Sequence, residues 1–376
     1  GTVATDYIAT TTVAVSEGPV ANMPRLNSVA GGCPSLLLEP QRTNLVTQSE
    51  YFGDSSWLKT RATITVNAAT SPSDSNTADK IIANTDSNSH FIDHPATTPS
   101  GTPFTVSVYA KAGEYGFMQI NNQADNSIAN FNLIDGTLGT ISGYTASITS
   151  AGSGWYRCIA TRTFSGSPTT HRFALVTAST SVRLESFTGN GTDGYYVYGA
   201  QFEAGSYATS YIPTYGTAAT AAIEQAVLPT TSFDLTGDWS ILLDFGNVYK
   251  TSTASEYILK LDTDTNDFYL YAAGTTTAGL NIYLPSQGGY VFGSSDNAAW
   301  GVDASKICVT YDSATGRLVY FINGSKYNEQ TSALSFGNSA SGSKFYPGGN
   351  NIVNIKKYLF FESALTDAEA ITLTTL

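Results

Sequence analysis

Short runs of alternating apolar and polar residues, divided by turn formers, are the feature that most constrains the fold of this chain. An alternation with a period of two is typical of β-strands, because successive side chains point to opposite faces of a sheet. Such runs between residues 41 and 222 are Trp57–Lys59, Ala62–Val66, Ala78–Ile82, Phe104–Ala110, Phe117–Ile120, Trp155–Thr161 and Arg172–Val176. Because no helical crossover separates these runs, we expect an antiparallel jelly-roll β-sandwich over residues 41–222.

The second half of the chain, residues 223–376, predicts another sandwich. Its apolar runs are Trp239–Phe245, Tyr257–Leu261, Phe268–Tyr271, Ile307–Tyr311, Leu318–Ile322 and Ile352–Phe361. The small, low-complexity stretch from Thr214 to Ala222 is the expected boundary between the two sandwiches. A short helix is expected near the C-terminus, with Thr366 as its N-cap and Glu369 completing a capping box. We therefore expect an all-β chain of two tandem sandwiches.

Residues 1–40 are predicted to form an extended arm that ends in an apolar clasp. Leu36–Leu38 lie between Pro34 and Pro40, in a run too short for a helix and unable to form a central strand at either proline. We expect this clasp to lead into the first sandwich and to pack with the outgoing segment Tyr195–Tyr215. An arm of this size has no core of its own, so it must pack on the next domain or on a neighbouring subunit.

The charge balance excludes two classes of partner. The net charge is −12, only 13% of the residues are charged, and no cluster of Lys or Arg interrupts the acidity. Binding to a nucleic-acid backbone needs a basic surface, so we expect neither nucleic acid nor an anionic membrane as a partner. No apolar run approaches the roughly 20 residues that span a bilayer, so we expect no membrane insertion.

The cysteines and the first residue bear on the origin of the chain. Cys33, Cys158 and Cys308 are odd in number and far apart, and they lack the spacing of metal ligands. Each lies beside apolar or strand residues, so we expect buried thiols in a protein made in a reducing cytosol. The sequence begins at Gly1 rather than Met, and we expect it to be a processed or excised fragment.

Four motifs in a fixed order carry a resemblance to a known family. They are LLLEPQRTNLVTQSEYF from Leu36, FTVSVYAKAG from Phe104, GWYRC from Gly154 and DGYYVYGAQFEAGSYATSYIPT from Asp193. Together they resemble a domain of bacteriophage tail-fibre and other virion proteins that is similar to jelly-roll carbohydrate-binding modules. The segment from Val309 to Gly324, and the ending of the chain, look like a concanavalin A-like (laminin G-like) domain.

This resemblance implies a virion protein that is made in the host cytoplasm and carried on the extracellular particle. Its expected partners are other virion proteins, copies of itself in a trimer, and a bacterial surface or marine polysaccharide. The expected function is that of a non-enzymatic adhesin that recognises host glycan. Two alternatives stay open: a purely structural protein of a capsid or tail, and a carbohydrate-binding accessory module of a polysaccharide-degrading enzyme.

The sequence offers little for catalysis. The three histidines, His90, His94 and His171, stand in no catalytic-triad or HExxH pattern. His90 and His94 are four residues apart, but Pro95 argues against the helix that would make them a metal pair. No strand carries the paired carboxylates of concanavalin A-like glycosidases. The acidic stretch Asp262–Asp267 is expected to be a hairpin turn, with a calcium loop as its alternative. We therefore expect no enzymatic activity.

A structural calcium ion is implied by the resemblance to carbohydrate-binding jelly rolls. Such modules often hold Ca²⁺ where the first strand meets the last. The matching positions here are Glu50 in the incoming segment and Gln201 or Glu203 in the outgoing one. A hard cation needs several oxygen ligands together. The alternative is a carboxylate that is exposed or paired with Arg42.

Sugar binding requires an aromatic ring beside amide or carboxylate groups that bond hydroxyls. Tyr115, Tyr144, Tyr290 and Trp300 lie in expected loops that offer this combination, and they are the predicted glycan contacts. The alternative for each is packing over an end of a sandwich or a contact with another subunit. Trp57 and Trp155 match positions of the family that look like core.

Overall fold

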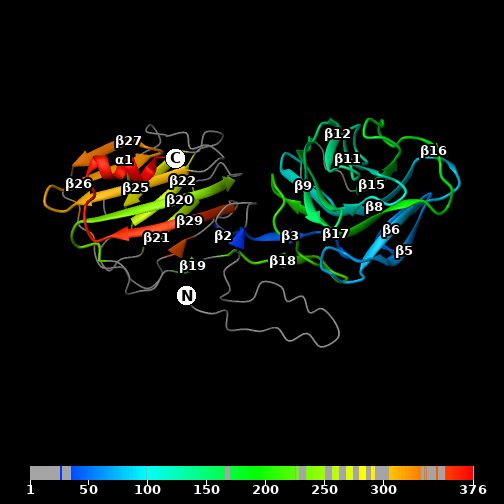
Figure 1. Ribbon diagram of the computed structural model, residues 1–376, viewed down its shortest axis with the longest axis horizontal. Coiled ribbons are helices and arrows are strands. Elements are labelled where there is room, and N and C mark those ends of the chain that lie inside the picture. The colour runs from blue at the N-terminus through cyan, green and yellow to red at the C-terminus, as the bar shows by residue number, and fades with distance from the viewer. Residues whose placement is uncertain are drawn as a thin grey trace, which may run out of the picture. The chain divides into compact units, whose positions relative to one another are not determined.

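The structure is a computed structural model that describes residues 26–27, 35–98, 100–165, 170–224, 226–227, 234–249, 256–261, 268–273, 279–284, 289–292, 305–331, 334, 336, 344–345 and 352–375. The chain divides into two compact units (Figure 1). The first unit holds Arg42–Ala221, and the second holds Ala222–Leu376 together with the strand Ser35–Leu38. Each unit contains two antiparallel sheets of six or seven strands, so the predicted all-β fold of tandem sandwiches is confirmed.

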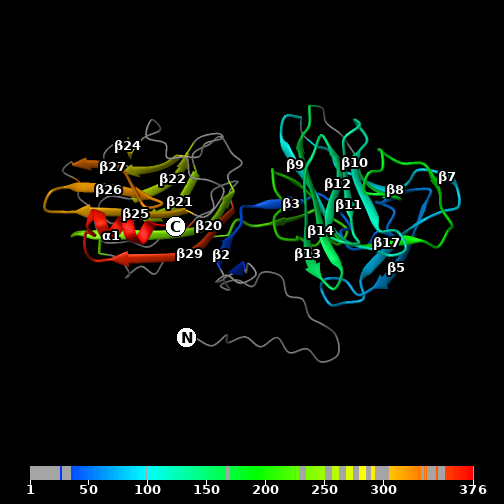
Figure 2. The ribbon, with the colours of Figure 1, turned by 45° about the horizontal axis from the view of Figure 1, so that its top comes forward.

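Two six-stranded sheets build the first unit and can be followed in Figures 1 and 2. The sheet that we name the β9 sheet has the order β13-β14-β9-β17-β6-β5, formed by β5 Ala62–Ala69, β6 Ala78–Ala83, β9 Pro103–Lys111, β13 Thr145–Gly152, β14 Trp155–Thr163 and β17 Gly194–Ala204. The second, named the β10 sheet, has the order β12-β11-β10-β15-β8-β4, formed by β4 Leu58–Thr60, β8 His90–Pro95, β10 Phe117–Asn122, β11 Ile128–Asn132, β12 Thr137–Ser142 and β15 Thr170–Val176.

Alternation decides which side chains fill the core between these sheets. In β9, Phe104, Val106 and Val108 are buried in the core. The alternate residues Ser107 and Tyr109 face away from it. Burial of such side chains contributes about 1.5–3 kcal/mol each. The core also holds a ring cluster in which the Trp57, Phe173 and Phe202 centroids lie 5.6–6.2 Å apart. The predicted core position of Trp57 is therefore confirmed.

The incoming and outgoing segments of the first unit, from Arg42 onward, pack together. Strand β3 (Arg42–Asn44) pairs with β18 (Ala219–Ala221), and Gln48 forms a bridge with Tyr215. A further two-stranded sheet joins β7 (Ser87–Asn88) and β16 (Phe187–Thr188).

The three leucines of the predicted clasp belong elsewhere. Leu36–Leu38 form β2 (Ser35–Leu38), which pairs with Val353–Ile355 in the second unit. The interpretation of these leucines as the entrance to the first sandwich was therefore wrong. Pro40 follows soon after the end of this strand, but it does not decide which sheet the strand joins.

The second unit is also built from two sheets. One has the order β1-β2-β29-β20-β25-β26-β27, with β1 Leu26–Asn27, β20 Trp239–Tyr249, β25 Ser305–Asp312, β26 Arg317–Ile322, β27 Ser325–Thr331 and β29 Ile352–Phe361. The other has the order β19-β28-β21-β22-β23-β24, with β19 Ala226–Val227, β21 Glu256–Leu261, β22 Phe268–Ala273, β23 Gly279–Leu284, β24 Gly289–Phe292 and β28 Lys344–Phe345. Strands β25 and β26 form the predicted hairpin.

The helix α1 (Asp367–Thr374) packs against β25, β26 and β27 (Figure 1). The Thr366 side chain accepts a hydrogen bond from the Glu369 backbone, and the Glu369 side chain accepts one from the Thr366 backbone, which confirms the capping box. Among the described residues, no helix is long and apolar enough to cross a membrane. Cys158 and Cys308 are buried free thiols, as predicted, and Cys33 lies outside the described residues.

Candidate functional site

Of the four predicted glycan contacts, Tyr144 is the one that the structure contradicts. Its side chain is only 9% exposed and packs in the core of the first unit. The ring lies 5.4 Å from the Arg162 guanidinium carbon, and its hydroxyl accepts a hydrogen bond from Asn122. Gly143 precedes it with φ +71°, so the tight turn directs the tyrosine inward. Tyr144 therefore fits the alternative given for these rings, packing within the sandwich, and does not offer an exposed ring to a glycan.

The other three predicted contacts remain predictions. Tyr115 is half-buried, and its ring meets Phe187 edge-on at 5.4 Å. Tyr290 lies in β24, opposite Tyr283, but its side chain is outside the described residues. Trp300 is also outside the described residues. The structure does not bring the four together in one described site.

Glu50, a predicted calcium ligand, is held by tyrosine hydroxyls. The hydroxyls of Tyr198 and Tyr211 both donate to its Oε1, at 3.0 and 3.1 Å. The Tyr211 hydroxyl also lies 2.6 Å from the Ser49 hydroxyl. Burial, followed by the Glu50 charge, raises the pKa of Tyr211 well above its ordinary value, so this phenol stays a donor. These bonds tie the incoming segment to the outgoing one.

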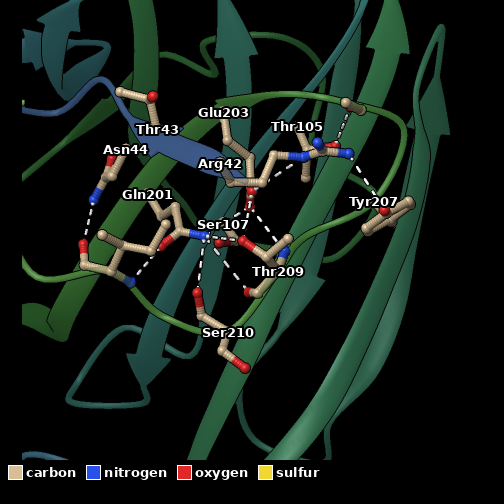
Figure 3. A network of polar contacts seen from close by, with 12 residues as sticks. Arg42, Thr43, Asn44, Thr105, Ser107, Gln201, Glu203, Tyr207, Thr209 and Ser210 are labelled. Carbon is tan, nitrogen blue, oxygen red and sulfur yellow. Dashed lines mark hydrogen bonds and ion pairs between the residues drawn. The ribbon is translucent and has the colours of Figure 1, made fainter. Parts of the chain in front are cut away.

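Glu203, the other predicted ligand, lies in the buried polar network of Figure 3. Its Oε1 accepts from the Gln201 amide at 2.7 Å and from the Thr209 backbone at 3.0 Å. Its Oε2 accepts from the Thr209 hydroxyl at 2.7 Å and lies 4.0 Å from Arg42 Nε. Burial raises the pKa of Glu203, which these hydrogen bonds oppose. Because both oxygens face donors, Glu203 does not fit a calcium ligand.

The calcium prediction can be tested by the thermal stability of the protein. Among the described residues, no three His, Cys, Asp or Glu side chains gather in a group that could hold a metal. A calcium site filled at about 100 times its Kd would add about 2.7 kcal/mol, so the unit that holds it should unfold several degrees higher in excess CaCl₂ than in excess EDTA. Because Glu50 and Glu203 both accept hydrogen bonds from protein donors, we expect the midpoint of the first unit to agree within about 1 °C in the two buffers. A calcium-dependent rise of that transition would contradict this expectation.

A row of polar side chains crosses the outer face of the β10 sheet. In register, Asn121 of β10 lies opposite Arg172 of β15, and Arg172 lies opposite Asp93 of β8. Residues that pair directly in antiparallel strands point to the same face. Their chain neighbours Ile120, Phe173 and Ile92 fill the core. We call Asn121, Arg172 and Asp93 the Arg172 row.

Strong local contacts fix the geometry of the Arg172 row. Arg172 Nε donates to Asp93 Oδ2 at 3.1 Å, and the guanidinium lies 4.6 Å above the ring of Phe91. The Asn121 amide donates to Gln119 Oε1 at 3.1 Å, and that oxygen also accepts from the Leu184 backbone. The arginine, the carboxylate and the amide are thus held in place before any ligand arrives.

The segment between β15 and β16 lies along the same face. The Asn130 amide donates to the backbone oxygens of Ser179 and Ser181, at 3.1 and 2.7 Å. The Gln119 amide donates to the Val182 backbone oxygen at 3.1 Å. The segment is therefore fixed to the sheet by side-chain amides of β10 and β11, while the Val182 side chain is 71% exposed.

Two acceptors of the Arg172 row have no protein partner. Asn121 Oδ1 and Asp93 Oδ1 are buried without a hydrogen bond, in side chains that are 0% and 5% exposed. Burial raises the pKa of Asp93, although the hydrogen bond and charge of Arg172 oppose the shift. A buried acceptor without a partner costs about 1–3 kcal/mol, so its retention needs a reason.

Two apolar side chains lie on the same face, one at an end of the row and one farther along β10. Phe117 lies on the same face of β10, four residues before Asn121, and is half-buried. Leu58 pairs with Asp93 at the other end of the row and is 56% exposed. Sequence reasoning missed this site, although polar residues at the outward positions of Phe117–Asn122 were visible. The missing information was the register that aligns Asn121 with Arg172 and Asp93.

Comparisons with known proteins give no family assignment. No family model matches this chain, and no curated protein matches it.

Several solved structures match with low similarity. The CBM40 of the Ruminococcus gnavus IT-sialidase bound to α2,6-sialyllactose is 13% identical, with TM-score 0.30, and the match covers 40% of this chain and 98% of that one. A putative carbohydrate-binding protein from Bacteroides ovatus is 11% identical, with TM-score 0.27 and coverage of 76% and 79%. Domains LG4-5 of the mouse laminin α1 chain are 10% identical, with TM-score 0.25 and coverage of 74% and 89%. TM-scores this low assign no function to this chain.

Proposed function

We propose that this chain is a non-enzymatic glycan-binding protein, and that the Arg172 row contacts the sugar. The observation that carries the proposal is the pair of buried, unpartnered oxygens, Asn121 Oδ1 and Asp93 Oδ1, on either side of a guanidinium. A sugar hydroxyl donates one hydrogen bond and accepts others. Hydroxyls of a sugar could donate to these oxygens while accepting from Arg172.

The flanking apolar residues support the same ligand class. Carbohydrate sites combine a few oriented polar groups with apolar or aromatic surface for the C–H faces of the ring. Leu58 offers such surface next to Asp93, and Phe117 offers more of it roughly 13 Å from Asn121 along β10. Tyr115 remains a candidate glycan contact of the first unit, and Tyr290 and Trp300 remain candidate contacts of the second.

The setting that we propose is a bacteriophage virion. The resemblance of the sequence motifs to tail-fibre proteins supports an adhesin that is made in the host cytoplasm, carried on the particle, and directed at bacterial surface or marine polysaccharide. A trimer would multiply weak sites, since avidity can exceed the affinity of one site by about 10²–10⁴. An accessory module of a polysaccharide-degrading enzyme would use the same row, and a structural virion protein would leave it without a glycan.

We predict that changing one oxygen of the row weakens binding. A glycan array of bacterial and algal polysaccharides identifies the ligand, and titration calorimetry then measures its Kd. Asp93→Asn should raise that Kd at least about tenfold, because it removes the charge that strengthens a hydrogen bond to a sugar hydroxyl. The matched control is Asp74→Asn, an exposed residue at φ +58°, where asparagine is well tolerated.

The outcomes separate the candidate functions. An unchanged Kd in Asp93→Asn, with folding intact by circular dichroism, would exclude the Arg172 row as the site. An empty array from a well-folded protein would reject the adhesin and favour the structural virion protein. Light scattering of the same sample tests the proposed trimer. Cleavage of the bound polysaccharide during incubation would overturn the proposal that the chain is not an enzyme.

A further inference from the structure

Two further arginines, Arg162 and Arg183, lie near the Asn121 end of the Arg172 row, although the whole chain carries a net charge of −12. Arg172 pairs with Asp93 at 3.1 Å, and Arg162 pairs with Asp125 at 2.8 Å. The third arginine, Arg183, lies on the segment between β15 and β16. This group thus contains three guanidinium groups and two carboxylates.

Arg183 is held at a fixed place beside the row. Its Nη2 donates to the backbone oxygen of Asn122 at 2.8 Å, directly after Asn121 in β10. Its Nε is buried and has no hydrogen-bond partner. Burial is the main cause that lowers the pKa of Arg183, and the nearby charge of Arg172 lowers it further. Two cations are therefore close enough to repel each other.

The carboxylate nearest in the chain does not neutralise Arg183. Glu185 accepts hydrogen bonds from the Thr177 backbone, the Thr177 hydroxyl and the Ser181 hydroxyl, at 2.7–2.9 Å. These bonds join Glu185 to Thr177 and Ser181 of its own segment rather than to Arg183. Asp125 attracts Arg183 electrostatically, but it is already paired with Arg162. One positive charge thus remains in excess at this end of the row.

We propose that the Arg172 row takes an acidic sugar, whose anionic group lies against Arg183 while its hydroxyls bond Asp93 and Asn121. This inference rests on the proposed glycan-binding function. An anion supplies the acceptor that Arg183 Nε lacks, and it relieves the repulsion between the two guanidinium groups. A simple inorganic anion fits less well, because Asp93 Oδ1 and Asn121 Oδ1 need donors. A sugar with a carboxylate or sulfate group supplies both kinds of group.

The test compares oligosaccharides of glucose, glucuronic acid and glucose sulfate, matched in length and linkage, by titration calorimetry on the full chain. We expect an acidic ligand to bind at least roughly tenfold more tightly than the neutral one, and its affinity to fall as salt is added. The carboxylate and sulfate arms show which anion is preferred. Arg183→Gln should remove this preference.

Two further variants give the experiment its controls. Arg183→Lys keeps the charge without the Nε donor, so it should retain part of the acidic preference even if Arg183→Gln folds poorly. Lys111→Gln removes one positive charge from the opposite β9 sheet and should change nothing. Equal binding of neutral and acidic sugars, unaffected in Arg183→Gln or Arg183→Lys, would overturn this inference and leave the proposed function standing. A lack of binding to these sugars and to the whole array would instead reject both.

Discussion

Asn44→Ala is expected to destabilise the first sandwich by at least about 3 kcal/mol. The Asn44 side chain is fully buried, and its amide donates to the backbone oxygens of Ala200 and Ile212, at 3.0 and 2.9 Å. Its Oδ1 accepts from the backbone of Val46 and Phe202, at 3.1 and 3.0 Å. Alanine would leave these four backbone groups buried without partners, at about 1–3 kcal/mol for each that finds no other partner.

Calorimetry can measure this loss, because the chain has two units that can unfold separately. The transition of the first unit should move down by several degrees, whereas that of the second should stay in place. Asn76→Ala is the matched control, since its exposed side chain makes one hydrogen bond, to the Asn67 backbone oxygen at 3.1 Å. A shift in Asn44→Ala no larger than in the control would show that Asn44 does not join the incoming and outgoing segments.

Mild acid is expected to destabilise the first sandwich through two buried histidines. His94 and His171 are 1% and 0% exposed, and burial lowers the pKa of each from 6.5 to about 4. Between those values the unfolded chain binds protons that the folded chain does not, so the free energy of unfolding falls as the pH falls. From pH 7.5 to pH 5 we expect a loss of about 2 kcal/mol per histidine.

The chain contains its own control for this experiment. All three histidines lie in the first unit, so the unfolding transition of the second unit should move much less over the same pH range. Burial also raises the pKa of three carboxyl groups, Asp79, Asp93 and Glu203. As the pH falls, the folded chain binds protons at these groups before the unfolded chain does, which stabilises the fold and opposes the effect of the histidines. His171→Gln removes one of the two histidines with a lowered pKa, so the unfolding free energy of the first unit should depend less on pH in this variant. Equal acid sensitivity of both units would show that the histidines do not cause it.

Local patterns were enough to predict the elements of both sandwiches. Period-two alternation located β9 and β14, and the turn signal Asp135-Gly136 lies between β11 and β12, which pair as a hairpin. The Thr366 and Glu369 spacing predicted the capping box of α1. Each of these signals depends on residues that are neighbours in the chain.

Contacts between residues that are far apart in the chain could not be predicted from these local patterns. Asn44 belongs to the motif that begins at Leu36, but two of its hydrogen-bond partners lie 156 and 168 residues away in the chain. Tyr144 was expected in a loop that could contact a glycan, but its ring is buried in the core of the first unit. The predicted calcium ligand Glu203 instead accepts hydrogen bonds from Gln201 and Thr209. In each case the partners, rather than the residue type, decide what the side chain does.

The sequence by itself determined that this chain folds into two β-sandwiches and which strand residues can face a core, because alternation is a property of one strand. Only the tertiary structure decided which strands are neighbours and in what register. It placed Leu36–Leu38 in the second sandwich, and it aligned Asn121, Arg172 and Asp93 on three adjacent strands. Register depends on the packing of residues far apart in the chain, since a slip of one residue turns every side chain of a strand to the opposite face.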